Sequence, residues 1–598
     1  MTTYTAPLRD MRFVMEELCG MGEIATLPGL ADATPDLVAA VLEEAAKVAG
    51  EVLAPINQQG DVEGSRLVDG HVTTPPGWKE AYTTFIEGGW NGAVNEPEWG
   101  GMGLPWLVNV AVQEMFQGAN MAFSLCPMLT QGAIEAISLN GSEELKQRFL
   151  PKMVAGEWTG TMNLTEPQAG SDLGAVRTRA ERAEGHYLIS GQKIFITYGD
   201  HDLTANIIHL VLARTPDAPP GVKGISLFVV PKFIDDGNGA APRPNDVQCV
   251  SIEHKLGIHA SPTAVMSFGD RGGAVGYLVG EENRGLEYMF VMMNLERLVV
   301  GLQALGVSER AYQQAVAYAR ERIQGQPIGS RAGERLPIIH HPGIRRELML
   351  MRAEIEAMRA VAYAAGRASD LYYRHPDADE RARNKARLDL LTPVVKGWCT
   401  ERSVDLTSIN IQIHGGMGYV EETGASQYFR DARITSIYEG TTAIQANDLV
   451  GRKIIRDEAK TARALFQEMQ NLDPALASNA DPAAPVIRAA LKAGVDEASR
   501  VVDWVLEAHR RDPRLPAAAS ISVLLLFGTL AGGYEMARAA LAAGQRLADG
   551  GAGDPDFLAA KIATARFYAQ QVMPRIGALG RAIVDGSETA LALDTELF

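Results

Sequence analysis

The spacing of hydrophobic residues changes twice along the chain and divides it into helical and strand-rich parts. Up to about residue 158, apolar residues recur at helical spacing, as in residues 39–51 (AAVLEEAAKVAGE) and 143–153 (EELKQRFLPKM). Turn-forming clusters such as residues 96–105 (EPEWGGMGLP) interrupt these segments. The pattern predicts an N-terminal helical domain over residues 1–158.

Residues 159–285 have a different pattern, rich in β-branched and aromatic residues. Residues 186–197 (HYLISGQKIFIT) contain a Ser-Gly pair between two strand-like halves, which predicts a hairpin. Further strands are predicted at 207–212, 225–230 and 264–268. Short strands at close spacing, without helices between them, predict a small antiparallel barrel or sandwich.

Helical patterns return after residue 285. Three long segments rich in Ala, Leu, Arg and Glu predict a helical bundle over residues 286–460. These segments are 286–322, 341–374 and 383–411. Residues 478–485 (SNADPAAP) predict a loop or linker inside a further helical domain, 461–598. The predicted fold class is therefore mainly α with a small central β domain.

The length of the chain indicates several domains, and its charge limits the kinds of partner that it binds. A chain of 598 residues is too long for a single hydrophobic core. Its net charge of -17 argues against nucleic acid or an anionic membrane as the main partner. A few local arginines can still hold an anionic ligand such as a phosphate.

The cysteines and the apolar runs favour a cytoplasmic protein without a transmembrane segment. Four cysteines are scattered without a CxxC pair, which predicts buried free thiols rather than disulfides or a metal site. The first residues lack the apolar core of a signal peptide. The longest apolar run, residues 521–531, is shorter than the roughly 20 residues that span a bilayer, and we interpret it as a buried helix.

Several common site motifs are missing from the sequence. No GxGxxG follows a predicted strand, and no GxxxxGK[ST] occurs, so standard Rossmann and P-loop nucleotide sites are not indicated. HExxH is also missing, which makes a catalytic metal an unfavoured interpretation.

Three segments could bind an anionic ligand, although each also has a purely structural interpretation. Residues 164–172 (LTEPQAGSD) can present N–H groups and hydroxyls to a pyrophosphate, or form a surface turn. In residues 412–419 (QIHGGMGY) the glycines permit close approach of a ligand or simply end a helix, and we interpret His414 as structural. Residues 318–329 (YARERIQGQPIG) place arginines at a helix end, toward solvent or a phosphate.

A fourth segment, residues 434–445 (ITSIYEGTTAIQ), contains a single carboxylate, Glu439. Such a residue is either a solvated loop residue or a base held in a dry site. No other charged residue lies in this window. If Glu439 is a base, this absence predicts an environment without a neighbouring cation, which would otherwise weaken its basicity.

Taken together, these segments closely resemble those of the acyl-CoA dehydrogenase family. The matching stretches keep the family's order and separations and cover residues 160–445 densely. They are LTEPQAGSD, KIFIT (193–197), KLGIHASPT (255–263), NLERLVVG (294–301), YARERIQGQPIG, QIHGGMGYVEE and YFRDARITSIYEGT. The N-terminal YTAPLRDMRF and the extra C-terminal domain resemble a longer bacterial branch. That branch includes 3-methylmercaptopropionyl-CoA and broad-range fatty acyl-CoA dehydrogenases.

The resemblance implies an FAD enzyme that oxidises an acyl-CoA thioester to the trans-2-enoyl-CoA. Glu439 would take the α-proton, its own backbone N–H would help hold the thioester carbonyl, and the β-hydride would pass to the flavin. The implied FAD contacts are Thr165, Ser171, Phe195, Thr197, Arg322, Gln412, Gly415, Gly416 and Thr441. The implied substrate contacts are Ser171, Arg297, Tyr438 and Gly440.

Two departures from the family pattern concern cofactor and loop contacts. The turn after Arg322 is one residue shorter than usual, and His259 stands where an arginine is common. The resemblance further implies a homodimer and electron-transferring flavoprotein as the electron acceptor, because no Cys cluster could hold iron–sulfur.

Two alternatives and the substrate stay open from sequence. One alternative is an acyl-CoA oxidase or monooxygenase on the same fold, and the other is a catalytically silent acyl-CoA-binding protein. The acyl chain could be the sulfur-containing 3-methylmercaptopropionyl group or a short, medium or long fatty acyl group.

Overall fold

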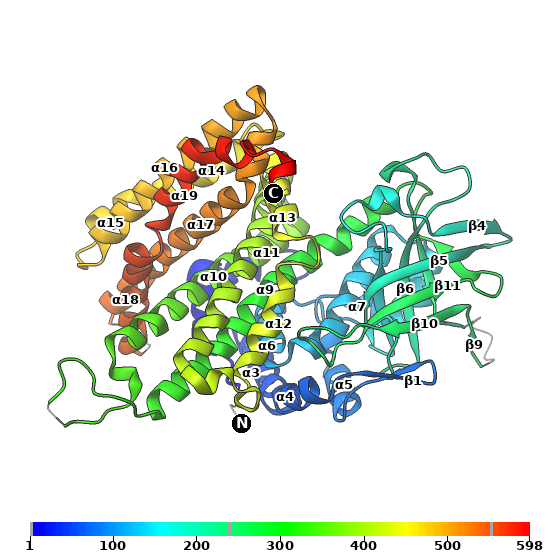
Figure 1. Cartoon of the computed structure of the whole chain (residues 1–598), viewed down its shortest axis with the longest axis horizontal. Coiled ribbons are helices and arrows are strands. Elements are labelled where there is room, and N and C mark those ends of the chain that lie inside the picture. Colours follow the sequence, from blue (N-terminus) through cyan, green and yellow to red (C-terminus); the bar gives the residue numbers. More distant parts are fainter. Residues whose placement is uncertain (1–3, 236–240, 332, 551–553) are drawn as a thin grey trace. The chain divides into compact units, whose positions relative to one another are not determined.

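The computed structural model describes residues 4–235, 241–331, 333–550 and 554–598 (Figure 1). Packing divides the chain into two compact units, which are described separately. The helical unit comprises residues 1–46, 105–118 and 297–598, and the sheet unit comprises 47–104 and 119–296. The four domain boundaries expected from the sequence stay predictions.

The sheet unit is built on an eight-stranded sheet with the order β10-β11-β5-β12-β7-β6-β3, in which β4 also pairs with β5. Neighbouring strands are antiparallel except for the parallel pair β3–β6. The small, mainly antiparallel β domain expected from the sequence is therefore confirmed. The strands are β3 (Trp158–Asn163), β4 (Arg179–Ala183), β5 (His186–Thr197), β6 (Asn206–Ala213), β7 (Ser226–Pro231), β10 (Val247–Ile252), β11 (Thr263–Phe268) and β12 (Ala274–Leu278).

The hairpin predicted at the Ser-Gly pair is wrong, because β5 is a single strand of 12 residues. Gly191 lies within it at a φ of 150°. A Cβ at this position would lie 2.9 Å from the Thr178 Cα and 2.6 Å from its Oγ1. Glycine is therefore needed here because the backbone segment at Thr178 comes close to β5, and not because the chain turns.

Two helices cover one part of this sheet and form its main core. α7 (Met121–Asn140) is followed closely by α8 (Glu143–Val154), which matches the predicted helix at 143–153. Ser142 caps the N-terminus of α8, since its side chain accepts a hydrogen bond from the Leu145 N–H at 3.3 Å. The helices bury a continuous apolar cluster against β3, β6 and β7. That cluster includes Ile134, Phe149, Leu150, Ile208, Leu210 and Val229.

The helical unit contains the long helices predicted after residue 285 and the C-terminal helices. The long ones are α9 (Gly285–Glu321), which belongs to this unit from residue 297 onward, α10 (Pro342–Arg374) and α11 (Ala378–His414). They are followed by α12 (Ala425–Thr435) and α13 (Thr442–Asp448). The C-terminal helices are α14 (Lys460–Gln470), α15 (Asp473–Ser478), α16 (Ala484–Arg511), α17 (Arg514–Ala548), α18 (Pro555–Gln571) and α19 (Arg575–Gly586).

The C-terminal helices attach to the bundle mainly through α17, which packs against both α10 and α11. Gly528 on α17 is what permits this contact. A Cβ there would lie only 2.1 Å from the Trp398 Cγ on α11, and Trp398 is fully buried. The predicted extra helical domain therefore belongs to the same compact unit as the bundle.

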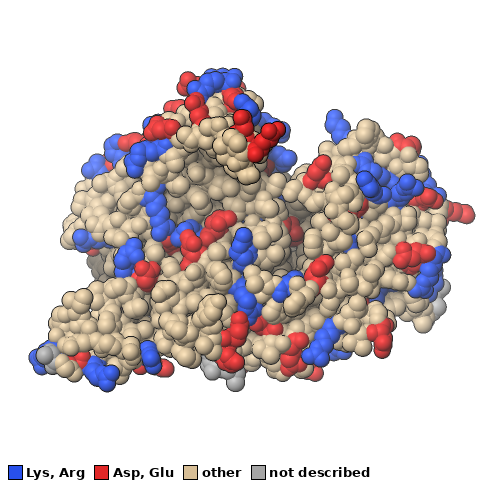
Figure 2. Space-filling model, in the orientation of Figure 1, with Lys and Arg blue, Asp and Glu red and all other residues tan. Residues whose placement is uncertain are grey.

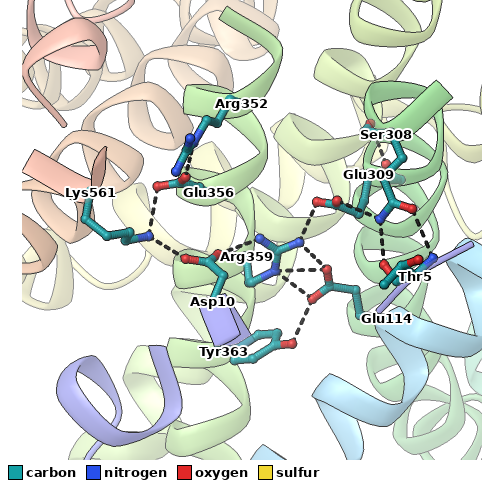
Figure 3. Close-up of polar contacts among 12 residues, drawn as sticks. Thr5, Asp10, Glu114, Ser308, Glu309, Arg352, Glu356, Arg359, Tyr363 and Lys561 are labelled. Carbon is teal, nitrogen blue, oxygen red and sulfur yellow. Dashed lines mark hydrogen bonds and ion pairs between the residues drawn. The ribbon is translucent and has the colours of Figure 1, made fainter. Parts of the chain in front are cut away.

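A buried network of charged side chains joins five segments of the helical unit (Figure 3). Arg359 on α10 pairs with Asp10 at 2.6 Å, with Glu114 at 2.6 Å and with Glu309 at 2.9 Å. Lys561 on α18 pairs with the same Asp10 at 2.6 Å. Because Asp10 lies near the N-terminus and Lys561 in the C-terminal helices, the network fastens distant parts of the chain together.

The predicted buried thiols are observed for three of the four cysteines. Cys19, Cys126 and Cys399 are buried free thiols, whereas Cys249 on β10 is only partly buried. Burial raises the pKa of Cys19 to about 12, which keeps this thiol protonated and unreactive at neutral pH.

Three described helices are long and apolar enough to cross a bilayer: α7, α9 and α17. Most of each apolar window is buried within the protein, namely 83%, 78% and 72% respectively. The run at 521–531 lies inside α17, so its interpretation as part of a buried helix is confirmed. On the face drawn in Figure 2, acidic and basic side chains are interspersed over a largely uncharged surface.

Candidate functional site

In the sheet unit, the predicted anion-binding stretch 164–172 begins directly after β3. Glu166 and Ala169 exchange two backbone hydrogen bonds at 3.0 and 2.9 Å, so a tight turn forms around Pro167. The Thr165 carbonyl accepts a hydrogen bond from the Ile194 N–H at 2.9 Å. This bond brings Thr165 beside the β5 segment that contains Phe195 and Thr197.

A buried ion pair locks these two segments together. The Lys193 ammonium lies 2.8 Å from the Glu166 carboxylate and also donates to the Leu164 carbonyl at 3.0 Å. Thr178 donates to the same carboxylate through its N–H and its hydroxyl at 3.0 and 2.6 Å. Burial would raise the pKa of Glu166, but Lys193 and these hydrogen bonds hold it at about 2, so the carboxylate stays charged. Sequence reasoning missed this pair because its members are 27 residues apart and neither is unusual locally.

Phe195 has the most unusual geometry of the predicted flavin contacts. The pairing of β5 with β11 contains a β-bulge at this residue. Ile196 pairs with Ala264 and Lys193 with Met266, so two residues of β5 lie opposite one residue of β11. Phe195 lies in this bulge at a φ of 60°, a conformation that is costly for an aromatic residue. Its side chain is 58% exposed. The backbone at Phe195 is therefore strained, and the large ring of this residue faces outward. A stacking surface for a planar ligand would require such an exposed ring.

The remaining predicted contacts of the sheet unit differ in exposure. Thr197 is half-buried at the end of β5 and is paired with Thr263, whereas Ser171 is exposed. His259, which replaces a common arginine, bridges the 255–263 loop to α4 (Ala54–Glu63). Its Nδ1 lies 3.0 Å from an Asp61 carboxylate oxygen and its Nε2 2.9 Å from the Lys255 carbonyl. This loop is thus held by the histidine itself.

In the helical unit, Glu439 lies in a tight turn between α12 and α13. Its φ is 54° and that of the following Gly440 is 86°, so two successive residues adopt the left-handed conformation. A Cβ on Gly440 would lie 2.9 Å from the Gln445 Nε2, which explains why glycine follows Glu439. The Gln445 amide donates to the carbonyls of Glu439 and Gly440 at 3.1 and 3.3 Å. Glu439 is half-buried, so it is neither a solvated loop residue nor fully enclosed.

The expectation that no cation lies near Glu439 is wrong. Lys396 on α11 donates a hydrogen bond to the Gly440 carbonyl at 2.6 Å, and its ammonium interacts electrostatically with Glu439. The window 434–445 lacks other charges in sequence, but the fold supplies one from 43 residues upstream. Sequence reasoning missed Lys396 because a single lysine in a long helix carries no local signal of its position.

The other predicted residues near Glu439 are also constrained. The Tyr438 hydroxyl donates to the Gln303 side chain on α9, and Arg297 on the same helix is buried. Thr441 caps the N-terminus of α13, since its hydroxyl accepts a hydrogen bond from the Ile444 N–H at 3.3 Å. That hydroxyl keeps its own proton to donate to a ligand.

A second group of predicted residues gathers where α9 and α11 end. The rings of Tyr318 and His414 stack there with centroids 4.2 Å apart. His414 also contacts the Asn410 carbonyl at 2.8 Å and is buried, which fits its interpretation as a structural residue. The stack places the ends of the two helices side by side, and the predicted FAD contacts on them are exposed. These are Arg322, Gln412, Gly415 and Gly416.

Gly415 and Gly416 leave open space beside the backbone. Gly415 has a φ of 61°. Among the described residues, nothing lies within 4 Å of a Cβ built on either glycine. A ligand could therefore approach the main chain directly at this point.

The structure thus brings the predicted residues together in three groups. Thr165, Phe195 and Thr197 are adjacent in the sheet unit. In the helical unit, Tyr438, Glu439 and Thr441 lie in one turn, and Arg297 on α9 interacts electrostatically with Lys396, which contacts that turn. The residues at the ends of α9 and α11 form another group. Their roles as FAD and substrate contacts stay predictions.

Family models match nearly the whole chain. The model described as "Acyl-CoA dehydrogenase, N-terminal domain" matches residues 38–157, and "Acyl-CoA dehydrogenase, middle domain" matches 161–270. "Acyl-CoA dehydrogenase, C-terminal domain" matches 283–454, and "Acetyl-CoA dehydrogenase C-terminal like" matches 460–594.

Individual relatives and solved structures are also similar to this chain. A relative from Ruegeria pomeroyi named 3-methylmercaptopropionyl-CoA dehydrogenase is 49% identical over 597 residues, 98% of this chain and 99% of the relative. An acyl-CoA dehydrogenase from Bacillus anthracis, solved in complex with FAD, is similar in fold with a TM-score of 0.73 and 22% identity, covering 95% of this chain and 92% of that one. A chain from a structure described as the electron transferring flavoprotein of Acidaminococcus fermentans is 27% identical with a TM-score of 0.56, covering 70% of this chain and 97% of that one.

Proposed function

We propose that this chain, which belongs to the acyl-CoA dehydrogenase family, oxidises an acyl-CoA thioester to the trans-2-enoyl-CoA with bound FAD. The observation that carries the proposal is the turn at Glu439. A carboxylate held by two successive left-handed residues in a half-buried turn is suited to a base whose direction must be controlled. The 49% identity to a named dehydrogenase over almost the whole chain supports the same reaction.

The residues present fit FAD. The exposed, strained Phe195 offers an aromatic surface for a flavin ring, beside the hydroxyls of Thr165 and Thr197. The open backbone at Gly415 and Gly416, with the exposed Arg322 and Gln412, offers donors and space for a phosphate-bearing ligand. FAD, when bound, would accept the β-hydride of the substrate.

The chain's own contribution to the chemistry is proton abstraction. The α-hydrogen of a thioester is weakly acidic, so its removal needs a well-aimed carboxylate. Gln445 and Lys396 hold the peptide groups around Glu439 and therefore fix the direction of its side chain. Tyr438, which precedes Glu439 in the chain, donates a hydrogen bond from its hydroxyl to the Gln303 side chain. Backbone N–H groups of this turn would hold the thioester oxygen where negative charge develops.

For the substrate we propose 3-methylmercaptopropionyl-CoA, on the basis of the R. pomeroyi relative. Short, medium and long fatty acyl-CoAs are the competing choices. The test is anaerobic flavin bleaching with a series of acyl-CoAs of increasing length that includes the sulfur compound. Fastest bleaching with 3-methylmercaptopropionyl-CoA is the expected result, and a clear preference for butyryl-CoA or longer chains would overturn this choice.

For partners and location we propose a homodimer in the cytoplasm that passes electrons to electron-transferring flavoprotein. Support for the acceptor comes from the A. fermentans similarity, and support for the location from the four free cysteines. Support for the dimer comes from Ile328 and Tyr419, near the ends of α9 and α11, which are each 89% exposed. Light scattering on the purified protein should give twice the chain mass of 64.4 kDa.

The oxidase alternative predicts a different electron acceptor. An oxidase would reoxidise its reduced flavin rapidly in air and release hydrogen peroxide during turnover. We expect slow reoxidation by oxygen and fast reoxidation by electron-transferring flavoprotein. Rapid peroxide formation at the rate of flavin reduction would favour the oxidase. A silent acyl-CoA-binding protein would show no bleaching with any thioester.

A further inference from the structure

Lys396 is a completely buried lysine in the middle of α11. Its relative exposure is 0%, and its ammonium donates to the Gly440 carbonyl at 2.6 Å. Gln445 donates to the same carbonyl at 3.3 Å, so Lys396 makes the shorter contact to this oxygen. Burying an ammonium is costly, and a lysine in such a position therefore needs a reason beyond packing.

The charges that face Lys396 come from three segments of the helical unit. Glu439 in the turn and Glu401 on α11 stabilise its charged form, whereas Arg297 on α9 opposes it. Burial is the largest influence and lowers the pKa of Lys396, and the net value is about 7. Lys396 is thus a group that changes charge near neutral pH beside the carboxylate of Glu439.

The turn that Lys396 contacts is the strained one. Glu439 and Gly440 have φ values of 54° and 86°, and left-handed residues of this kind persist only where the surroundings hold them. From α11, Lys396 donates to the Gly440 carbonyl in this turn, and Glu401 accepts a hydrogen bond from the Thr442 hydroxyl directly after it. A hydrogen bond from a charged donor is roughly twice as strong as a neutral one, so Lys396 restrains the turn most firmly while it is protonated.

We propose that Lys396 is a positioning residue that holds the turn bearing Glu439 and, through its charge, sets how tightly Glu439 binds a proton. This inference rests on the proposed function, since it assigns Glu439 the role of base. It makes the rate of proton abstraction depend on the charge of a residue that does not touch the substrate. Protonated Lys396 favours the carboxylate form of Glu439, and neutral Lys396 releases that restraint.

The direct test is the pH profile of anaerobic flavin reduction, measured as rate over substrate Kd, in wild type and in Lys396→Met, Lys396→Gln and Lys396→Arg. The rising limb of this profile reports the base of the free enzyme. We expect the limb to move to higher pH by about one unit or more in Lys396→Met and Lys396→Gln, because the cation is removed. Lys396→Arg keeps a permanent charge and should leave the limb in place or move it to lower pH. Lys385→Met, at an exposed lysine on the same helix, is the matched control and should not move it.

A second measurement does not depend on activity. Lys396 has a pKa near 7 in the fold against 10.5 unfolded, so between these values only the unfolded chain holds this proton. The buried charge therefore destabilises the folded protein fully below about pH 7, and this destabilisation decreases as pH rises toward 10.5. We expect the Tm of wild type minus that of Lys396→Met to increase from pH 6 to pH 9.

The possible outcomes separate the two proposals. If wild type bleaches but the profiles of Lys396→Met and Lys396→Arg coincide with it, the role of Lys396 is refuted while the function stands. If no acyl-CoA bleaches the wild type but the Tm difference rises with pH as expected, the proposed function fails and the buried titrating lysine is supported. A Tm difference that does not change with pH refutes the titration of Lys396.

Discussion

Substitution of Lys561 by methionine tests how the C-terminal helices are attached. Lys561 is almost fully buried, with a side-chain exposure of 1%, and lies 2.6 Å from Asp10 and 2.8 Å from Glu356. Methionine fills a similar volume but removes the cation. Removing one partner of a buried ion pair costs about 3–5 kcal/mol. Asp10 keeps Arg359 and Glu356 keeps Arg352, so the lower end, about 3 kcal/mol, is expected.

This loss converts to a shift in Tm. The helical unit has about 360 residues, and its unfolding entropy at about 2.1 cal/mol/K per residue gives a fall of about 4 °C. Scanning calorimetry at pH 7 measures it. The matched control is Lys492→Met, whose exposed pair with Asp496 on α16 contributes at most about 1 kcal/mol and should move Tm by less than about 1.5 °C. Equal shifts for the two variants would refute the assigned importance of the buried network.

The same network predicts how acid affects the protein. Burial would raise the pKa of Asp10, but Lys561 and Arg359 outweigh it and hold that pKa at about 2, below the ordinary 3.8. A lowered pKa stabilises the fold above the ordinary value, and this stability is lost as pH falls from about 4 to 2. Lys561→Met should therefore lie closer to wild type in Tm at pH 3 than at pH 7. A difference that grows toward pH 3 would contradict the assignment.

Two further substitutions test the flavin surface and the helix packing. Phe195→Ala should weaken FAD binding about tenfold, measured by fluorescence titration, because a stacked aromatic contributes about 1.5 kcal/mol, and an unchanged Kd would contradict the stacking role. Gly528→Ala places a Cβ 2.1 Å from the Trp398 Cγ and should cost about 1–3 kcal/mol, seen as a lower Tm, whereas Gly577→Ala on the open face of α19 should not lower it.

The positions of most helices and strands could be predicted from the hydrophobic pattern. The predicted strand at 207–212 and the predicted helix at 341–374 agree closely with β6 and α10. The predicted hairpin at Ser190 and Gly191 failed because glycine has two uses in strands. It permits a turn, and it also permits close contact with another backbone segment, which here is the segment at Thr178. Local sequence does not distinguish these uses.

The roles of the site residues expected from the sequence stay predictions, and the electrostatics around Glu439 could not be predicted from the sequence. The residues around Glu439 left it as either a solvated loop residue or a base, and only the resemblance of several segments to one family assigned it as the base. The ammonium of Lys396 and the ion pair of Glu166 with Lys193 were missed because each depends on residues brought together from far apart in the chain. The proposed base does not lie in a cation-free environment, and its strength is expected to depend on the charge state of Lys396.

Anaerobic flavin bleaching by Glu439→Gln measures directly whether Glu439 is the base. This variant should retain FAD and bind acyl-CoA but bleach at least about 10³-fold more slowly than wild type, since it lacks the proton-accepting carboxylate. Glu458→Gln is the matched control, because Glu458 also has a left-handed φ of 51° but is exposed, and it should bleach at the wild-type rate. Near-normal bleaching by Glu439→Gln would contradict the assignment of Glu439 as the base of an acyl-CoA dehydrogenase.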